Sequence, residues 1–133
     1  MEPLEIDHEA REDAVVVRVK GDVDSSTVDQ LVGNLIDALD MAGAHPARLL
    51  VVDLQEVSFF GSAGLNAMLD SHEQGRAAGT VVRLVASHGQ VLQPIEVTEL
   101  DRILDIYPSL PQAMRGIKPF VDPDDGDEQG YAG

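Results

Sequence analysis

The chain lacks cysteine and tryptophan and contains few aromatic residues. Without cysteine it forms no disulfide, no thiolate nucleophile and no Cys-ligated zinc or iron–sulfur site. Phe, Trp and Tyr make up only 4% of the residues, so the core must consist of Val, Leu, Ile and Ala. No apolar run approaches the roughly 18 residues that a membrane span requires, and the first residues, MEPLEIDHEA, are acidic where a secretory signal is basic and then apolar. We therefore expect a cytoplasmic protein.

Basic residues are also scarce, with nine Lys and Arg against 24 Asp and Glu, but the acidic excess is uneven. Residues 1–13 hold six acids and one base, and residues 122–128 hold five acids and no base. Residues 14–121 hold thirteen acids and eight bases, which leaves a net charge of −5. With no cluster of bases, this part of the chain has no electrostatic footprint for nucleic acid or anionic lipid. The expected partners are proteins or small molecules, not nucleic acid and not a membrane.

The length of 133 residues and the 44% hydrophobic content are typical of one soluble domain with tails. We expect an acidic, partly ordered segment over 1–13, one folded domain over 14–118 and a disordered tail over 119–133. The tail, which contains VDPDDGDEQGYAG, has too little apolar surface to offset the entropy lost on ordering.

Three apolar runs predict strands, namely AVVVRVK (14–20), RLLVVDL (48–54) and TVVRLVAS (80–87). The second run does not alternate, which is typical of a central strand covered on both faces. The loop GDVDSS follows the first strand, and VSFFGSAG follows the second. Each loop leads into a helix, so the pattern predicts an α/β domain.

The first helix is indicated by apolar residues at three- and four-residue spacing from Val28 to Leu39, and it should end at Gly43. Its candidate N-caps are Asp24, Ser25 and Ser26, and Thr27 and Gln30 have the spacing of a capping box. The second helix is indicated by Leu65, Met68, Leu69 and His72, and it should close near Gly75 or Gly79. In QVLQPIEVTEL, periodicity allows a short helix interrupted at Pro94, and LDRILDIYPS fits a helix or an edge strand.

Several catalytic patterns are missing. His8, His45, His72 and His88 never have metal-binding spacing, so we assign them structural or solvated roles and expect no metal. A nucleophile elbow requires Gly two residues before the serine, and Phe60 stands there. Neither a phosphate-binding loop nor GxGxxG is present, which argues against nucleotide binding by the chain itself. We therefore expect no enzyme activity and no cofactor.

Ser62 falls where the loop after the second strand meets the start of a helix, and this position supports two interpretations. In the first, its hydroxyl caps the helix, a contribution of about 1 kcal/mol. In the second, the hydroxyl is an exposed phosphate acceptor, because a phosphate there would meet backbone N–H groups and the positive end of the helix dipole. Phosphorylation would add about 1.5 to 2 negative charges at one surface point.

Asp53 supports a rival hypothesis, since open α/β sheets place functional groups at the carboxyl ends of buried strands. Receiver domains of two-component signalling use such an Asp as phosphoacceptor, together with an acidic pair and a later Lys. Asp22 and Asp24 match the acidic pair, but after Lys20 the next Lys is Lys118, near the tail. The receiver interpretation therefore fails at the later Lys that those domains require.

The run VVDLQEVSFFGSAGLNAML, residues 51–69, resembles the signature of the STAS domain, particularly that of bacterial anti-sigma factor antagonists. GDVD at 21–24 and TVVRLVAS resemble that family's first loop and next strand. LDRILDIYPSLPQAM resembles its C-terminal segment, in which ILDIYP is a strand and SLPQAM begins a helix. The resemblance implies an α/β STAS fold with a mixed sheet of about four strands and helices packed against it.

The resemblance also implies a function in partner switching. An unmodified antagonist binds an anti-sigma factor that is a serine kinase, and the sigma factor is freed. The kinase, which holds the ATP and Mg²⁺, phosphorylates the serine aligned with Ser62, and a serine phosphatase reverses the modification. By similarity the partner-binding residues are Asp22, Asp24, Ser25, Gly61, Ser62, Ala63 and Gly64.

Two positions depart from the family pattern. Phosphorylated members usually have Asp before the acceptor serine, whereas this chain has Gly61. Because phosphoryl transfer depends mainly on positioning, this change predicts slow transfer or none. Gly61 should also loosen the turn by permitting a positive φ. Ala63 stands where the family often has a second Ser or Thr. The alternatives are therefore a non-phosphorylated STAS scaffold or an accessory subunit of a signalling or transport complex.

Overall fold

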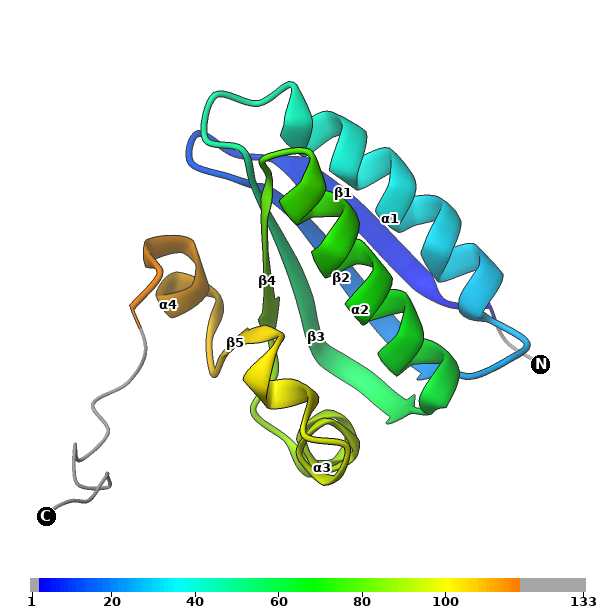
Figure 1. The fold of residues 1–133 in the computed structure, drawn as a ribbon. Helices are drawn as coiled ribbons and strands as arrows, with labels where there is room; N and C mark the ends of the chain where they lie inside the picture. The colour runs from blue at the N-terminus through cyan, green and yellow to red at the C-terminus, as the bar shows by residue number, and fades with distance from the viewer. Residues whose placement is uncertain (1–2, 118–133) are drawn as a thin grey trace, which may run out of the picture.

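The structure is a computed structural model that describes residues 3–117, and its centre is a five-stranded mixed sheet (Figure 1). The strands lie in the order β1-β2-β3-β4-β5; β1 is antiparallel to β2, and the other neighbouring pairs are parallel. Their bounds are β1 Glu5–Ala10, β2 Val15–Val23, β3 Leu49–Phe60, β4 Val81–Val85 and β5 Asp105–Tyr107. The predicted α/β class with a mixed sheet is confirmed, with one strand more than the approximate four.

The additional strand is β1, which lies in the acidic segment expected to be only partly ordered. Ile6 is its one apolar side chain packed against the main core, and Glu5, Asp7 and Glu9 are exposed. An edge strand with one covered face requires little apolar sequence, and its charges discourage pairing with other chains. The apolar pattern therefore carried almost no signal for β1.

Helices cover both faces of the sheet, and their bounds are α1 Val28–Gly43, α2 Ser62–Ala77, α3 Gly89–Val97 and α4 Leu110–Arg115, with a short 3₁₀ helix at Leu100–Arg102. The first two lie side by side over one face (Figure 1). Val91 and Ile95 of α3 join the core beneath them, and Ala113 of α4 packs in a smaller core on the opposite face.

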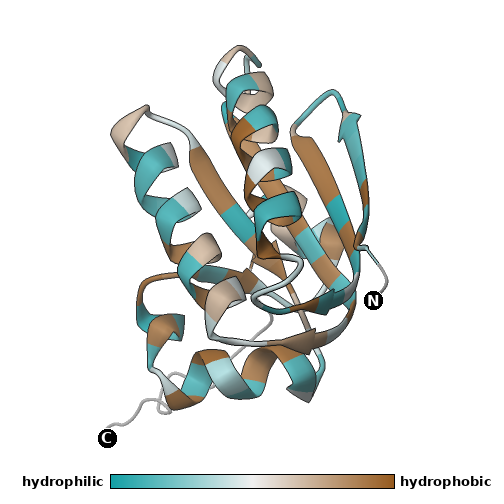
Figure 2. Ribbon diagram, turned by 90° about the vertical axis from the view of Figure 1, so that its right-hand side faces the viewer, coloured by the Kyte–Doolittle hydropathy of each residue, from teal (hydrophilic) through white to brown (hydrophobic). Residues whose placement is uncertain are grey.

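The central strands bury both of their faces, as the absence of alternation predicted for residues 48–54. On β2, Val15 and Val17 point into the main core, whereas Val16 belongs to the smaller core under α4. On β3, Leu50 and Val51 divide in the same way. Figure 2 shows the resulting apolar run along these strands. Because Val and Leu supply this burial, the lack of aromatic residues is no obstacle to a core.

Several boundaries differ from those that the sequence predicts. The second strand extends to Val23 and the third to Phe60, so both take in much of the segments expected to be loops. Two register shifts let β2 continue, between Arg18 and Lys20 and between Gly21 and Asp22, and Gly21 takes a φ of +119° there. In the C-terminal part, α3 runs through Pro94, whereas β5 and α4 confirm the strand and helix implied by the resemblance.

The predicted capping box at the start of α1 is wrong. Thr27 is the N-cap residue, but its side chain makes no capping hydrogen bond. Gln30 instead bonds the backbone of Leu4, accepting from its N–H at 2.9 Å and donating to its carbonyl at 2.7 Å. A contact with a residue 26 positions away cannot be inferred from local spacing.

The predicted tail, 119–133, lies outside the described residues. Among residues 3–117, no helix combines the length and apolar character needed to cross a membrane.

Candidate functional site at one edge of the sheet

The GDVD segment at 21–24 and the GSAG segment at 61–64 meet at the edge of the sheet where β2 and β3 end. The strands β2 and β3 are parallel, so their carboxyl ends lie on the same side of the sheet. Val23 and Phe60 are the last residue pair of the two strands. The Gly61 N–H then donates to the Val23 carbonyl at 3.0 Å, which ties the start of α2 to the loop before α1. The structure therefore brings the loop that contains Asp24 beside the Gly61–Ser62 turn. Figure 1 shows the end of β2 beside the start of α2.

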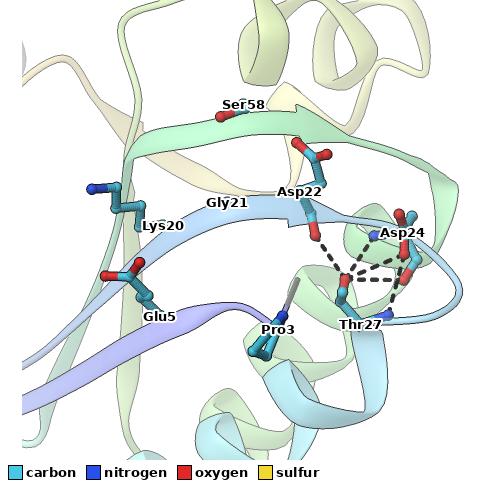
Figure 3. A pocket seen from close by; sticks show the side chains of 8 residues that line it. All are labelled: Pro3, Glu5, Lys20, Gly21, Asp22, Asp24, Thr27 and Ser58. Carbon is cyan, nitrogen blue, oxygen red and sulfur yellow. Dashed lines mark hydrogen bonds between the residues drawn. The ribbon is translucent and has the colours of Figure 1, made fainter. Parts of the chain in front are cut away.

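Hydrogen bonds to Asp24 hold the first of these loops (Figure 3). Its Oδ1 accepts from the backbone N–H of Ser26 at 2.9 Å, from the Ser26 hydroxyl at 2.6 Å and from the N–H of Thr27 at 3.2 Å. These bonds, led by that from the Ser26 hydroxyl, lower the pKa of Asp24 below its ordinary value. Asp24 therefore acts first as the support of its own loop.

Thr27 completes this support from a buried position. Its hydroxyl donates to the Asp22 carbonyl at 2.7 Å and accepts from the Asp24 N–H at 3.0 Å. The Asp22 side chain is exposed, as is that of Ser25. Of the two predicted loop carboxylates, Asp22 is therefore the one with an exposed side chain.

Ser62 is exposed as the first residue of α2. The helix-capping interpretation of its hydroxyl is wrong, because Gly61 is the N-cap residue and no side-chain capping bond is made there. The predicted loosening at Gly61 by a positive φ is also wrong. Its φ of −90° and ψ of −173° are extended backbone that any residue adopts. The Ser62 hydroxyl thus lies in solvent at the positive end of a 16-residue helix.

Two further predicted residues follow in the first turn of α2. Ala63 is half-buried and Gly64 is buried. A Cβ atom at Gly64 would lie 2.7 Å from Cε1 of Phe60 and 2.8 Å from Cγ1 of Val23. Gly64 therefore lets the helix pack closely on the ends of both strands, and it is not part of the exposed surface.

A hollow of about 510 Å³ lies beside Asp22 (Figure 3). It is lined by Pro3, Glu5, Lys20, Gly21, Asp22, Asp24, Thr27 and Ser58. The sequence interpretation missed Glu5, Lys20 and Ser58. The pairing of β1 with β2 and the continuation of β3 place them there, and neither feature had a local signal in the sequence.

The rival phosphoacceptor, Asp53, is not placed at a strand end. Because β3 runs on to Phe60, Asp53 lies inside the strand, half-buried, and its Oδ1 accepts from the Gln55 N–H at 3.0 Å. This position removes the geometric basis of the receiver interpretation.

Three of the histidines form hydrogen bonds with backbone or side-chain atoms. His8 contacts Asn34 Oδ1 at 2.7 Å, and His45 and His88 donate to the carbonyls of Arg11 and Val57 at 2.7 Å and 2.8 Å. Among residues 3–117, no group of three or more His, Asp or Glu side chains is placed to hold a metal ion.

Comparison with known proteins identifies the family and agrees with the fold. The profile of the STAS domain matches residues 5–113. The chain belongs to the STAS domain family. This STAS-domain protein has the fold of an anti-sigma factor antagonist from Mycobacterium paratuberculosis, with a TM-score of 0.77 and 27% identity over 86% of this chain and 93% of the other.

Two other relatives are more distant. The phosphorylated form of the Bacillus cell fate determinant SpoIIAA shares the fold, with a TM-score of 0.61 and 17% identity, covering 85% of this chain and 97% of that one. Osmosensory protein A of Mycobacterium tuberculosis is 35% identical over 80 residues, which are 60% of this chain and 48% of that protein. The chain thus spans about half the length of this curated relative.

Proposed function

We propose that this STAS-domain protein is an anti-sigma factor antagonist that acts in the cytoplasm. In its unmodified form it binds an anti-sigma factor of the serine kinase type and frees the sigma factor. The Ser62 hydroxyl oxygen then attacks the γ-phosphorus of ATP held with Mg²⁺ by the kinase, ADP leaves, and the hydroxyl proton passes to a base of the kinase. A serine phosphatase later hydrolyses the phosphate ester and restores the binding form.

The observation that carries this proposal is the exposed hydroxyl of Ser62 beside the loop of Asp22 and Asp24. A phosphate on Ser62 would gain stabilisation from the N-terminus of α2 and would not disturb a buried group. It would also place about two negative charges next to the two carboxylates of the loop. A partner surface that fits the unmodified edge would then have to desolvate a highly charged group, so binding weakens.

The relatives give separate support. An antagonist of known structure shares the fold at 27% identity, and another protein of this fold has been solved in a phosphorylated form. The alternative is a non-phosphorylated STAS scaffold or an accessory subunit of a larger complex. The presence of Gly61 in place of the usual Asp favours this alternative.

The test is isothermal calorimetry of the protein with purified serine-kinase-type anti-sigma factors from the organism that encodes it. We expect Ser62→Ala to bind within about threefold of wild type, because the loss of one exposed hydroxyl changes little. Ser62→Asp should bind at least roughly tenfold more weakly, since it places a charge in the interface. Gln93→Glu, which adds a charge at an exposed position of α3, is the matched control and should bind like wild type.

Equal affinity of the Ser62→Ala and Ser62→Asp variants would remove Ser62 from the switch. Isolation of the protein in a stable assembly that contains no anti-sigma factor would favour the scaffold alternative.

A further inference from the structure

We infer that Phe59 is the apolar anchor of the docking edge, and that the anti-sigma partner receives its ring in an apolar pocket rimmed by basic side chains. This inference rests on the proposed function, because the occupant of the surface is the partner named there. It adds a contact residue that lies outside the sequence-predicted set.

The exposure of Phe59 is unusual among the aromatic side chains of the described residues, although Val97 is more exposed at 75%. Among residues 3–117 there are three aromatic side chains, and Phe60 and Tyr107 are buried at 3% and 4% exposure. Phe59 is 52% exposed. A single exposed apolar side chain is common on protein surfaces, so the placement of the ring, and not its exposure alone, carries the inference.

The ring of Phe59 lies against the Gly61–Ser62 turn. Its Cε2 and Cζ atoms are 3.0 Å and 3.4 Å from the position that a Cβ atom of residue 61 would occupy. The backbone of Gly61 is in an ordinary extended conformation, so its dihedral angles do not require glycine. What the glycine provides is room for the ring. Phe59 and Gly61 therefore form one apolar surface at a position where an Asp would place a carboxylate.

The surroundings of the ring are polar and acidic. Asp22 pairs with Phe59 across the strands, and the exposed Ser58 precedes it in the chain. Of the eight residues that line the adjacent hollow, Lys20 is the only base and three are acids. An aromatic side chain within a polar rim is the usual arrangement of a binding hot spot, and charge complementarity assigns basic side chains to the partner's rim.

The inference is tested by calorimetry of Phe59→Ala, Phe59→Leu and Val81→Ala with the purified serine-kinase-type anti-sigma factors. Loss of a hot-spot ring weakens binding by about 30-fold, so we expect that change in Kd for Phe59→Ala. Phe59→Leu keeps an apolar group and should lose less than about fivefold. Val81 is 48% exposed at the start of β4, the opposite end of the sheet, and Val81→Ala should bind like wild type. Thermal unfolding of each variant verifies that it is folded.

Each outcome has a distinct meaning. If wild type binds and Phe59→Ala binds within twofold of it, the anchor is refuted while the proposed function stands. If wild type binds none of these anti-sigma factors, the proposed function fails and the anchor fails with it. If light scattering shows a wild-type dimer that Phe59→Ala abolishes, a second copy of the chain covers the ring, and the inference is overturned.

Discussion

At the scale of single residues, two glycines inside helices have opposite environments. Gly64 in α2 meets the buried side chains of Phe60 and Val23, and neither can move without disturbing the core. Gly33 in α1 has no atom within 4 Å of the position where a Cβ would stand. The same substitution should therefore have opposite effects at the two positions.

We expect Gly64→Ala to lower the free energy of unfolding by about 1–3 kcal/mol, because overpacking outweighs the better helix propensity of alanine. Gly33→Ala should raise it by about 0.5–1 kcal/mol, since only the propensity changes. Urea denaturation of both variants measures these differences. Stabilisation by Gly64→Ala would show that α2 is not held tightly against the strand ends.

We expect residue 61 to affect the phosphorylation proposed for Ser62. The backbone at residue 61 accepts any side chain, so Gly61→Asp requires only that the exposed Phe59 ring give way. An Asp there can orient the acceptor hydroxyl, and we expect the variant to be phosphorylated faster than wild type by a cognate kinase. Single-turnover phosphate incorporation measures the rate, with Gly61→Ala as the control for the ring displacement. An unchanged rate would show that residue 61 has no part in transfer.

The sequence predicted the position of Ser62, but it did not predict the function of Asp24 or the exposure of Phe59. The position of Ser62 at the start of a helix followed from the strand, turn and helix pattern around GSAG. The function of Asp24 in holding its own loop did not follow, because its partners Ser26 and Thr27 also fitted the pattern of helix caps. Phe59 was missed because an apolar residue in an apolar run gives no sign that it is exposed.

At the scale of elements, Arg83 of β4 adds polar contacts to the apolar packing of Ala113 that holds α4 on the sheet. Its Nη1 donates to the Ala113 carbonyl at 2.9 Å, and its Nε lies 3.5 Å from Asp105 Oδ2. The guanidinium carbon also lies 5.7 Å from the centre of the Tyr107 ring. Burial, followed by the hydrogen bond to Asp105, raises the pKa of the Tyr107 hydroxyl. One side chain thus links α4 to two strands.

We expect Arg83→Leu to loosen α4 without unfolding the protein. Loss of a hydrogen bond from a charged donor costs about 1.5–3 kcal/mol, so the amides of residues 113–117 should exchange at least about tenfold faster. Hydrogen exchange followed by NMR measures this change, and the α1 amides should keep their rates. Arg102→Leu is the control, because the Arg102 side chain is 78% exposed and pairs only with Glu99 in the ion pairs described. Equal acceleration throughout the sheet would contradict a local attachment.

The elements differ in how far the sequence determines them. The three inner strands and α1 follow from apolar periodicity, since each buries a continuous face. In contrast, β1 contains one packed apolar residue, and its place depends on pairing with β2. The extension of β3 to Phe60 depends on β2 as its neighbour, because residues 56–60 pair with residues 20–23. Such long-range pairing lies beyond local patterns.

At the scale of the whole molecule, the helices leave side chains exposed at the edge of the sheet where β2 and β3 end. Both faces are covered, by α1 and α2 on one side and by α4 on the other. Although α2 packs closely on the ends of β2 and β3, Asp22 and Phe59 at these ends and Ser62 at the start of α2 are exposed. The central claim is therefore that this edge is where a protein partner binds.

Hydrogen exchange with mass spectrometry tests this claim directly on the full chain, alone and with a purified serine-kinase-type anti-sigma factor. Our account predicts slower exchange on binding in residues 21–27 and 58–66, with α4 unchanged. Protection that falls on α4 and leaves those two segments unchanged would contradict it.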